Sequence, residues 1–408
     1  MPLSSSSPLP DTSRPSVREV FLVFLQLGLT SFGGPAAHLG YFREAFVVQR
    51  RWLGEQAYAD LVALCQFLPG PASSQVGMGL GLMRVGYGGA LAAWAGFTLP
   101  SAILLVLAAQ GLVHWGSAVP PGLLHGLHLA AIAVILQAVW SMGKAFCRGP
   151  VQLALMLAAT LVVMGWGAHW AGWVIVMLAL AGVAGVLLLR SGSTGAAGSL
   201  RVPVGSRAAV GWLMLFAALL ALSVMTWTGQ AAQLLAAFYR TGSLVFGGGH
   251  VVLPLLEGEL VQRGWVEAPV FLAGYGLAQA VPGPLFTFAA FLGATMQSAP
   301  TGWTGASLAL LAIFLPAFLL VAGALPFWER WRHLRWLRSA LQGINAAVVG
   351  LLLAALLQQG AASLHQWADL LVTGLALWLL MRLRWAPWLV VLVSALAGWA
   401  SSVLLPVA

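Results

Sequence analysis

The chain has 408 residues, of which 60% are hydrophobic and only 7% are charged. A soluble globular domain carries about 25% charged residues, so this composition leaves too little polar surface to face water. The 19 Lys and Arg residues outnumber the 10 Asp and Glu residues and give a net charge of +9. Composition therefore argues against a soluble enzyme or a free nucleic-acid-binding protein, and it predicts a polytopic membrane protein.

The predicted elements follow a polar N-terminal tail at 1–15, which lacks the features of a secretory signal and which we expect to be disordered. Charges and Gly/Pro punctuation then predict helical membrane segments at 16–48, 57–83, 87–112, 122–144, 150–166 and 169–190. A Gly/Ser-rich stretch at 191–207 predicts a cytoplasmic linker, followed by an extra transmembrane helix at 208–228. Further segments are predicted at 229–250, 268–297, 302–326, 339–358, 363–381 and 385–406. We therefore expect an all-α fold.

The two parts of the chain at 16–190 and 229–406 resemble each other. Ser31-Phe32-Gly33-Gly34 matches Val245-Phe246-Gly247-Gly248 at a spacing of 214, and Pro69-Gly70-Pro71 matches Pro282-Gly283-Pro284 at a spacing of 213. The starts of the two copies lie seven segments apart, which is an odd number. The copies are therefore predicted to have opposite membrane orientations, the inverted repeat of many secondary transporters.

The distribution of basic residues predicts which side of the membrane each loop faces. About 15 of the 19 fall on one side, which we expect to be cytoplasmic and to include the N-terminus. Arg43, Arg50 and Arg51 fall on the wrong side if the first two segments each cross the membrane. Re-entrant hairpins broken at the Gly/Pro motifs would return these arginines to the cytoplasm. Broken helices that cross fully remain the alternative.

The paired Gly/Pro breaks predict a binding site for an anion. Non-helical backbone at membrane depth survives only where protein or water satisfies its polar groups, and a restarting helix presents N–H groups and a partial positive charge. Plain helix packing and kinking is the alternative for such glycines and prolines. The predicted substrate-binding residues are Ser31, Phe32, Gly33, Gly34, Gln66, Pro69, Gly70, Pro71, Ser73, Ser74, Arg240, Phe246, Gly247, Gly248, Gly249, His250, Gln279, Pro282, Gly283, Pro284 and Thr287.

Few charged residues lie inside the apolar segments. Arg240 is one of them, and a charged residue at membrane depth usually faces a cavity or a partner, although its side chain could instead reach the membrane interface. The predicted anion-entry residues are Arg43, Arg50 and Arg51, whose alternative role is membrane topology alone. Asp60 and Glu257 are candidates for proton coupling, with solvated loop positions as the alternative. The sequence contains no pattern of a metal site, a cofactor site or a catalytic set.

Several long runs match a known family. FLQLGLTSFGGPAAHLGYFREAFVVQRRWL at 24–53, CQFLPGPASSQVG at 65–77, VFGGGHVVLPLL and AQAVPGP are similar to motifs of the chromate ion transporter family in its long, two-half form. The resemblance implies export of chromate across the bacterial plasma membrane, chromate resistance, recognition of the isosteric sulfate dianion and coupling to the proton motive force. An anion channel or an exchanger for sulfate or another oxyanion remains the alternative. Membrane lipid is an expected partner, nucleic acid is not, and the oligomeric state, including a homodimer, stays open.

Overall fold

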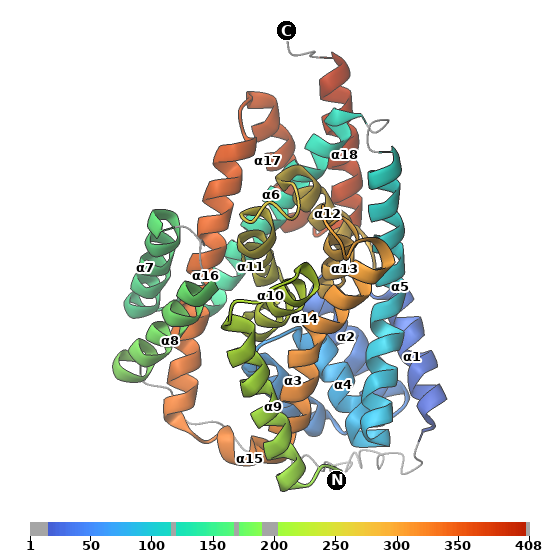
Figure 1. The fold of residues 1–408 in the computed structure, drawn as a ribbon, viewed down its shortest axis with the longest axis vertical. Helices are drawn as coiled ribbons and strands as arrows, with labels where there is room; N and C mark the ends of the chain where they lie inside the picture. Colours follow the sequence, from blue (N-terminus) through green and yellow to red (C-terminus); the bar gives the residue numbers. More distant parts are fainter. Residues whose placement is uncertain (1–14, 116–119, 167–170, 190–202, 405–408) are drawn as a thin grey trace, which may run out of the picture.

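The computed structural model describes residues 15–115, 120–166, 171–189 and 203–404. Residues 1–14 of the predicted tail and 191–202 of the predicted linker therefore lie outside the described residues, and the last two residues of the predicted linker, 206 and 207, are helical. Within those ranges the chain forms helices and no strand (Figure 1), which confirms the predicted all-α membrane fold.

The helices follow the order of the predicted segments. The first half contains α1 (Val17–Thr30), α2 (Gly34–Arg43), the π-helix η1 (Glu44–Gln49), α3 (Glu55–Phe67), α4 (Ala72–Val85), α5 (Tyr87–Trp115), α6 (Pro121–Phe146), α7 (Pro150–Trp166) and α8 (Ala171–Leu188). The connecting helix α9 (Ser206–Val224) overlaps the extra helix predicted at 208–228. The second half contains α10 (Gln230–Leu244), η3 (Gly249–Val251), α11 (Val252–Leu256), the π-helix η4 (Glu257–Val261), α12 (Ala268–Ala280), η5 (Leu285–Thr287), α13 (Phe288–Ala294), α14 (Gly302–Ala324), η6 (Leu325–Phe327), α15 (Trp328–Trp331), α16 (Arg335–Ser363), α17 (Trp367–Met381) and α18 (Pro387–Leu404).

Helix length separates the elements into two classes. Five helices of the described chain are long and apolar enough to cross a membrane, namely Tyr87–His114, Pro121–Phe146, Ser206–Val224, Gly302–Trp331 and Arg335–Ser363. By contrast, α1, α4 and α10 have 14, 14 and 15 residues, below the roughly 20 needed to span the hydrocarbon core. Figure 1 places α1–α4 in the lower half of the molecule and α10–α13 above them. This arrangement favours hairpins over full crossings.

The similarity between the halves extends to unusual backbone conformations. Each half carries a π-helix at the matching place, Glu44–Gln49 and Glu257–Val261, whose first residues are 213 apart. Soon after each comes a residue of positive φ, Arg51 at 50° and Gly264 at 69°, again 213 apart. Because π-helices are rare, their recurrence at one spacing shows that the repeat seen in the sequence is also a repeat of local structure.

The long inner helices exchange partners between the halves. α6 packs against α17 and α18 of the second half, and α16 packs against α7 and α8 of the first. Glycines allow both close approaches, because a Cβ on Gly126 would collide with the Ser394 carbonyl of α18 and a Cβ on Gly343 with the Ala181 carbonyl of α8. The inner helix of each half therefore packs against the outer helices of the other half. Neither half can bury its apolar surface alone.

Replacing Gly126 by leucine should destabilise the fold, because the added side chain forces α18 away from α6. Overpacking of this kind costs about 1–3 kcal/mol, and we expect a lower melting temperature of the detergent-purified protein. Gly374→Leu in α17 is the matched control, because a Cβ there meets no atom within 4 Å. An unchanged melting temperature for Gly126→Leu would contradict the exchanged packing.

Candidate functional site

The four helix breaks meet through two reciprocal hydrogen bonds. The Gly70 N–H donates to the Val245 carbonyl at 2.7 Å, and the Gly283 N–H donates to the Ser31 carbonyl at 2.9 Å. Gly70 and Gly283 occupy matching positions in the two halves, and so do Ser31 and Val245. We use the name break cluster for residues 31–35, 69–71, 245–249 and 282–284, which the structure brings together at the boundary of the two halves.

Glycine is required at the centre of both Pro-Gly-Pro turns. Gly70 has a φ of 123° and Gly283 a φ of 106°, a region that residues with a Cβ rarely adopt. A Cβ on Gly283 would lie 2.7 Å from Ser101 Oγ on α5, and a Cβ on Gly70 would lie 3.5 Å from Ala317 Cβ on α14. Each turn therefore packs against a long helix of the other half, so the position of the break depends on both halves.

The helix restarts differ between the halves. In the first half, α2 begins at Gly34 and α4 at Ala72, and neither start has a side-chain cap. Their first N–H groups lack partners within the helix and carry the positive end of the helix dipole. In the second half the chain restarts as short 3₁₀ turns, Gly249–Val251 and Leu285–Thr287. All four restarts therefore present backbone N–H groups, from α-helices in the first half and from short 3₁₀ turns in the second.

Two serine hydroxyls in the first half lack partners. Ser31 and Ser74 are 1% and 2% exposed, and their Oγ atoms make no hydrogen bond within the described protein. Leaving a buried polar group unpaired costs about 1–3 kcal/mol, which a water or a bound anion would offset. Thr287 differs, because its hydroxyl donates to the Pro284 carbonyl at 2.7 Å. The predicted role as a hydroxyl donor therefore fits the two serines better than the threonine.

His38 is the site residue that sequence reasoning missed. Its ring is 1% exposed, with Nε2 3.2 Å from the Ser31 carbonyl oxygen and Nδ1 3.4 Å from Ser73 Oγ. Because a carbonyl oxygen can only accept, Nε2 carries a proton. His38 therefore ties the first break to the start of α4. The sequence does show a histidine one helical turn after Gly34, which could have marked this residue. It does not show that the ring lies beside Ser73, which is 35 residues further along the chain.

Phe32 and Gly247 of the break cluster, and the adjacent His250, contact three other helices. The Phe32 ring lies 6.2 Å from the Trp388 ring of α18. Gly247, at a φ of 75°, faces Met142 of α6. His250 Nδ1 lies 2.8 Å from the Tyr275 hydroxyl of α12. The predicted His250 thus has a partner within the second half, and its role in binding stays a prediction.

The matched glutamines are not in equivalent surroundings. Gln66 is exposed near the end of α3, whereas Gln279 is half-buried and its side chain interacts with that of Tyr275. A half-buried amide beside a Pro-Gly-Pro turn can still donate to a substrate oxygen or a water. Of the two, Gln279 therefore has the geometry that fits the predicted binding role better.

Arg240 is occupied by protein groups. Its Nε and one Nη lie 2.6 and 2.7 Å from the two carboxylate oxygens of Glu259, and another Nη donates to the Ser223 carbonyl. Arg263 approaches the same carboxylate at 3.1 Å. Since a buried charge needs a partner, this bidentate pair accounts for an arginine at membrane depth. The structure thus places Arg240 in an ion pair that fastens α10 to η4.

The predicted entry arginines lie on the hairpin of the first half. Arg43 forms a bidentate pair with Glu55 at 2.6 and 3.0 Å, and both side chains are exposed. The hydrogen bond from Arg43 lowers the pKa of the Glu55 carboxyl. Arg51 is exposed and Arg50 is half-buried. Arg43 ends α2, and Arg50 and Arg51 lie between η1 and α3. The entry role of all three stays a prediction.

The two predicted proton-coupling carboxylates have different partners. Asp60 Oδ1 lies 3.3 Å from an Nη of Arg332, which gives this carboxylate a counter-charge. Glu257 is half-buried in η4 and accepts a hydrogen bond from the neutral amide of Gln359. The described residues hold no group of three or more His, Cys, Asp and Glu side chains that could bind a metal.

Comparison with known proteins identifies relatives over nearly the whole chain. The family model described as chromate transporter matches residues 18–186 and again 232–399, once in each half. The chain is 30% identical to the chromate transport protein of Pseudomonas aeruginosa over 400 residues, which cover 94% of this chain and 92% of the relative. It is 27% identical to a probable chromate transport protein of Synechococcus elongatus over 397 residues, covering 94% and 95%. No solved structure matches the chain.

A shorter relative corresponds to one half. An uncharacterised transporter of Bacillus subtilis is 27% identical over 170 residues, which cover 93% of that protein but only 40% of this chain. That length is close to the 169 residues of the first family match, 18–186.

Replacing His38 by alanine should weaken oxyanion binding, because Ser73 and the Ser31 carbonyl both lose a partner. A loss of about 1.4 kcal/mol corresponds to tenfold lower affinity, measured as the sulfate dependence of the melting temperature. His38→Gln keeps a donor for the Ser31 carbonyl and should recover part of the affinity. His114→Ala, at an exposed position in α5, is the control. Equal sulfate affinity in His38→Ala and the wild type would contradict the role of His38.

Proposed function

Because the chain belongs to the chromate transporter family, we propose that it exports chromate from the cytoplasm as a secondary transporter working by alternating access. Family membership and the long apolar helices make it a multi-pass membrane protein that transports chromate-type oxyanions. The observation that carries the finer proposal is the pair of reciprocal hydrogen bonds, from Gly70 to Val245 and from Gly283 to Ser31. These bonds gather four interrupted helices at one place between two similar halves.

The chemistry of the break cluster suits a tetrahedral dianion. The starts of α2 and α4 offer backbone N–H groups, and Ser31 and Ser74 offer unpaired hydroxyls. Helix N-termini bind phosphate and sulfate groups through these same donors. Neutral donors distinguish anions only by the shape and charge of the anion, and sulfate shares both with chromate. We therefore propose that sulfate binds at the same place and competes with chromate.

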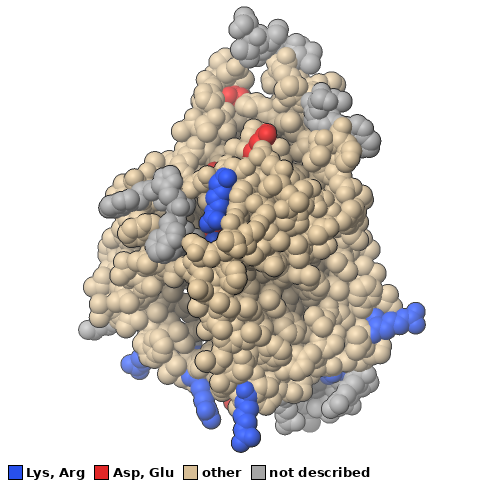
Figure 2. Space-filling view, viewed as in Figure 1, with Lys and Arg blue, Asp and Glu red and all other residues tan. Residues whose placement is uncertain are grey.

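The two halves are proposed to lie in opposite orientations. The hairpin elements of the first half lie below those of the second (Figure 1), and basic side chains gather at the lower end of the molecule (Figure 2). That end contains α15 and the start of α1 (Figure 1). By the positive-inside rule the lower end is cytoplasmic. We place the protein in the bacterial inner membrane, with the first-half hairpin on the cytoplasmic side and the second-half hairpin on the external side.

Alternating access follows from this arrangement. One hairpin lies toward each side of the membrane, and the break cluster lies where the two hairpins touch. Movement of one half against the other can expose the cluster to one side at a time, as in other transporters built from inverted repeats. The hydrogen bonds between Gly70 and Val245 and between Gly283 and Ser31 are the contacts that such a movement must change.

The membrane potential favours export of a dianion. Moving two negative charges out of a cell that is negative inside releases about 4.6 kcal/mol at 100 mV, twice the value for one charge. Proton coupling would add to this driving force. Glu257 is the better candidate, because its partner Gln359 is neutral whereas Asp60 is paired with Arg332.

Glu257→Gln should therefore remove any dependence of flux on a pH gradient.

Proteoliposomes provide the direct test. Labelled chromate flux would be measured at a clamped voltage, with and without excess sulfate. We expect saturable, voltage-driven chromate movement, stimulation by chromate on the opposite side and inhibition by sulfate. Flux that does not saturate and shows no stimulation from the opposite side would indicate an anion channel instead. No chromate flux from folded, inserted protein would overturn the proposed substrate.

Gly70→Ala should lower chromate flux about tenfold. The φ of 123° at Gly70 is strained for alanine by about 1–3 kcal/mol, and the new Cβ would lie 2.9 Å from the Gln75 side-chain nitrogen. Gly40→Ala in α2 is the control, because a Cβ there meets no atom within 4 Å. Wild-type flux in Gly70→Ala, at equal amounts of inserted protein, would remove the break cluster from the transport path.

A further inference from the structure

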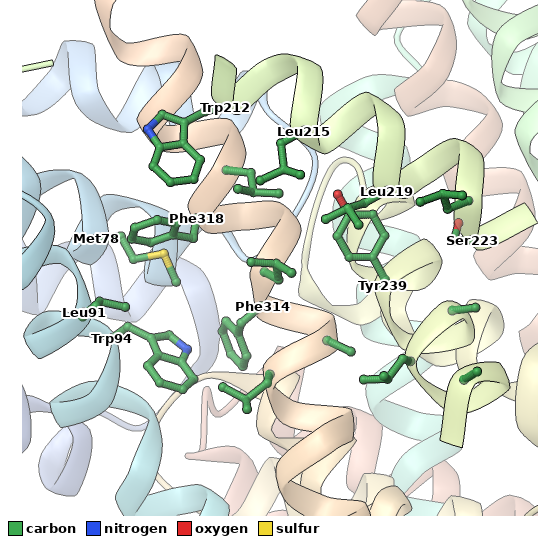
Figure 3. A pocket seen from close by; sticks show the side chains of 18 of the residues that line it. Met78, Leu91, Trp94, Trp212, Leu215, Leu219, Ser223, Tyr239, Phe314 and Phe318 are labelled. Carbon is green, nitrogen blue, oxygen red and sulfur yellow. The ribbon is translucent and has the colours of Figure 1, made fainter. Parts of the chain in front are cut away.

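A lateral groove over α14 is unsuited to an oxyanion. The groove has a volume of about 920 Å³, and Phe314 and Phe318 of α14 point into it between Trp94 of α5 and Trp212 of α9 (Figure 3). The residues that line it include no charged side chain. An anion placed there would lose its hydration without gaining equivalent bonds. Further contacts with the oxyanion are therefore to be sought at the break cluster itself.

Asn345 is a polar side chain well inside the long helix α16. This helix has 29 residues and is apolar enough to cross a membrane, and Asn345 lies about 15 Å along its axis from Arg335, the first residue. The side chain is half-buried, and its amide makes no hydrogen bond within the described residues. An amide without a partner is costly at membrane depth. Asn345 therefore has to face water or a ligand.

The Asn345 amide lies beside the first break of the second half. A Cβ on Gly247 would lie 3.4 Å from Asn345 Oδ1, and it would also meet the Met142 and Phe146 side chains of α6. The elements that follow this break, η3 and α11, pack against α16. Gly343, which contacts α8, lies two residues before Asn345 and therefore about 200° around the helix. Asn345 thus lies on the side of α16 that faces the break cluster.

The backbone next to Asn345 also has free donors. The N–H groups of Gly247 and Gly248 donate to no other group in the described part of the chain. Non-helical backbone at membrane depth persists only where protein or water satisfies it. The second half therefore offers two kinds of neutral donor at one place, namely backbone N–H groups and a side-chain amide.

The matching position of the first half is already occupied. Gly343 lies 217 residues after Gly126, and at the same spacing Asn345 matches His128 on α6. His128 Nε2 lies 2.8 Å from the Pro269 carbonyl oxygen at the start of α12. The inner helices of the two halves thus carry a polar side chain at the same place, and Asn345 is the one whose side chain has no protein partner.

We propose that Asn345 contacts the substrate, by donating a side-chain N–H to one oxygen of the oxyanion bound at the break cluster. This inference rests on the transport function proposed above. An asparagine amide has two N–H donors and no charge, so it adds a contact without adding a counter-charge. A tetrahedral dianion has four acceptor oxygens, so the donors of the first half and Asn345 of the second can bind different oxygens. The anion would then bridge the two halves.

Anion-dependent melting temperatures of the detergent-purified protein test the contact. Asn345→Ala should weaken sulfate and chromate binding about tenfold. The melting temperature without anion should stay unchanged, because the amide has no protein partner to lose. Asn345→Asp should weaken binding more than Asn345→Ala, because a carboxylate donates no N–H and repels a dianion. Gln342→Ala, at an exposed position on the same helix, is the control and should bind both anions as the wild type does.

A purely structural role would give the opposite pattern. A lower melting temperature of Asn345→Ala without anion, together with unchanged affinity for both anions, would overturn the contact. Equal affinity of Asn345→Asp and the wild type would also overturn it, since this substitution removes both N–H donors at nearly constant shape.

Chromate flux into proteoliposomes separates this inference from the proposed function. Asn345→Ala should raise the KM for chromate about tenfold at equal amounts of inserted protein. A KM equal to that of a wild type that does transport chromate would overturn the Asn345 contact and leave the proposed function standing. A folded wild-type protein that neither binds nor transports chromate or sulfate would overturn both.

Discussion

The structure depends on one constraint, namely that interrupted backbone inside a membrane must find hydrogen-bond partners within the protein. Each half of this chain breaks two helices and so exposes carbonyl and N–H groups that its own helices cannot satisfy. The two halves solve this reciprocally, because the Gly70 N–H bonds to the Val245 carbonyl and the Gly283 N–H bonds to the Ser31 carbonyl. The breaks can therefore exist only where both halves meet.

The rest of the packing follows from this dependence of each half on the other. The inner helices α6 and α16 each pack against the outer helices of the opposite half, through close contacts at Gly126 and Gly343. The Pro-Gly-Pro turns also rest on α5 and α14 of the opposite half. A single half of this chain would expose the same unsatisfied groups.

The charges of the protein are kept apart from its breaks. Arg240 is paired with Glu259, and Asp60 is paired with Arg332. What remains at the breaks is neutral, namely backbone N–H groups, serine hydroxyls and the His38 ring. At the proposed binding site, neutral donors would hold a dianion without trapping it, because no fixed counter-charge must be separated when the anion leaves. This property suits a transporter, which has to release what it binds.

The sequence by itself determined the helices, their interruptions and the repeat. These features are local: an apolar run of sufficient length forms a helix in a membrane, and clustered Gly/Pro motifs interrupt it, whereas the single prolines Pro100 and Pro316 lie inside α5 and α14. Tertiary structure alone decided the contacts between distant positions. It showed that the Gly70 N–H bonds to the Val245 carbonyl and that the His38 ring lies beside the Ser73 hydroxyl. It also showed that Arg240 is paired with Glu259, and that a lateral groove lies beside α9. No periodicity encodes such pairs, because side chains far apart in the sequence are brought together only when whole helices pack.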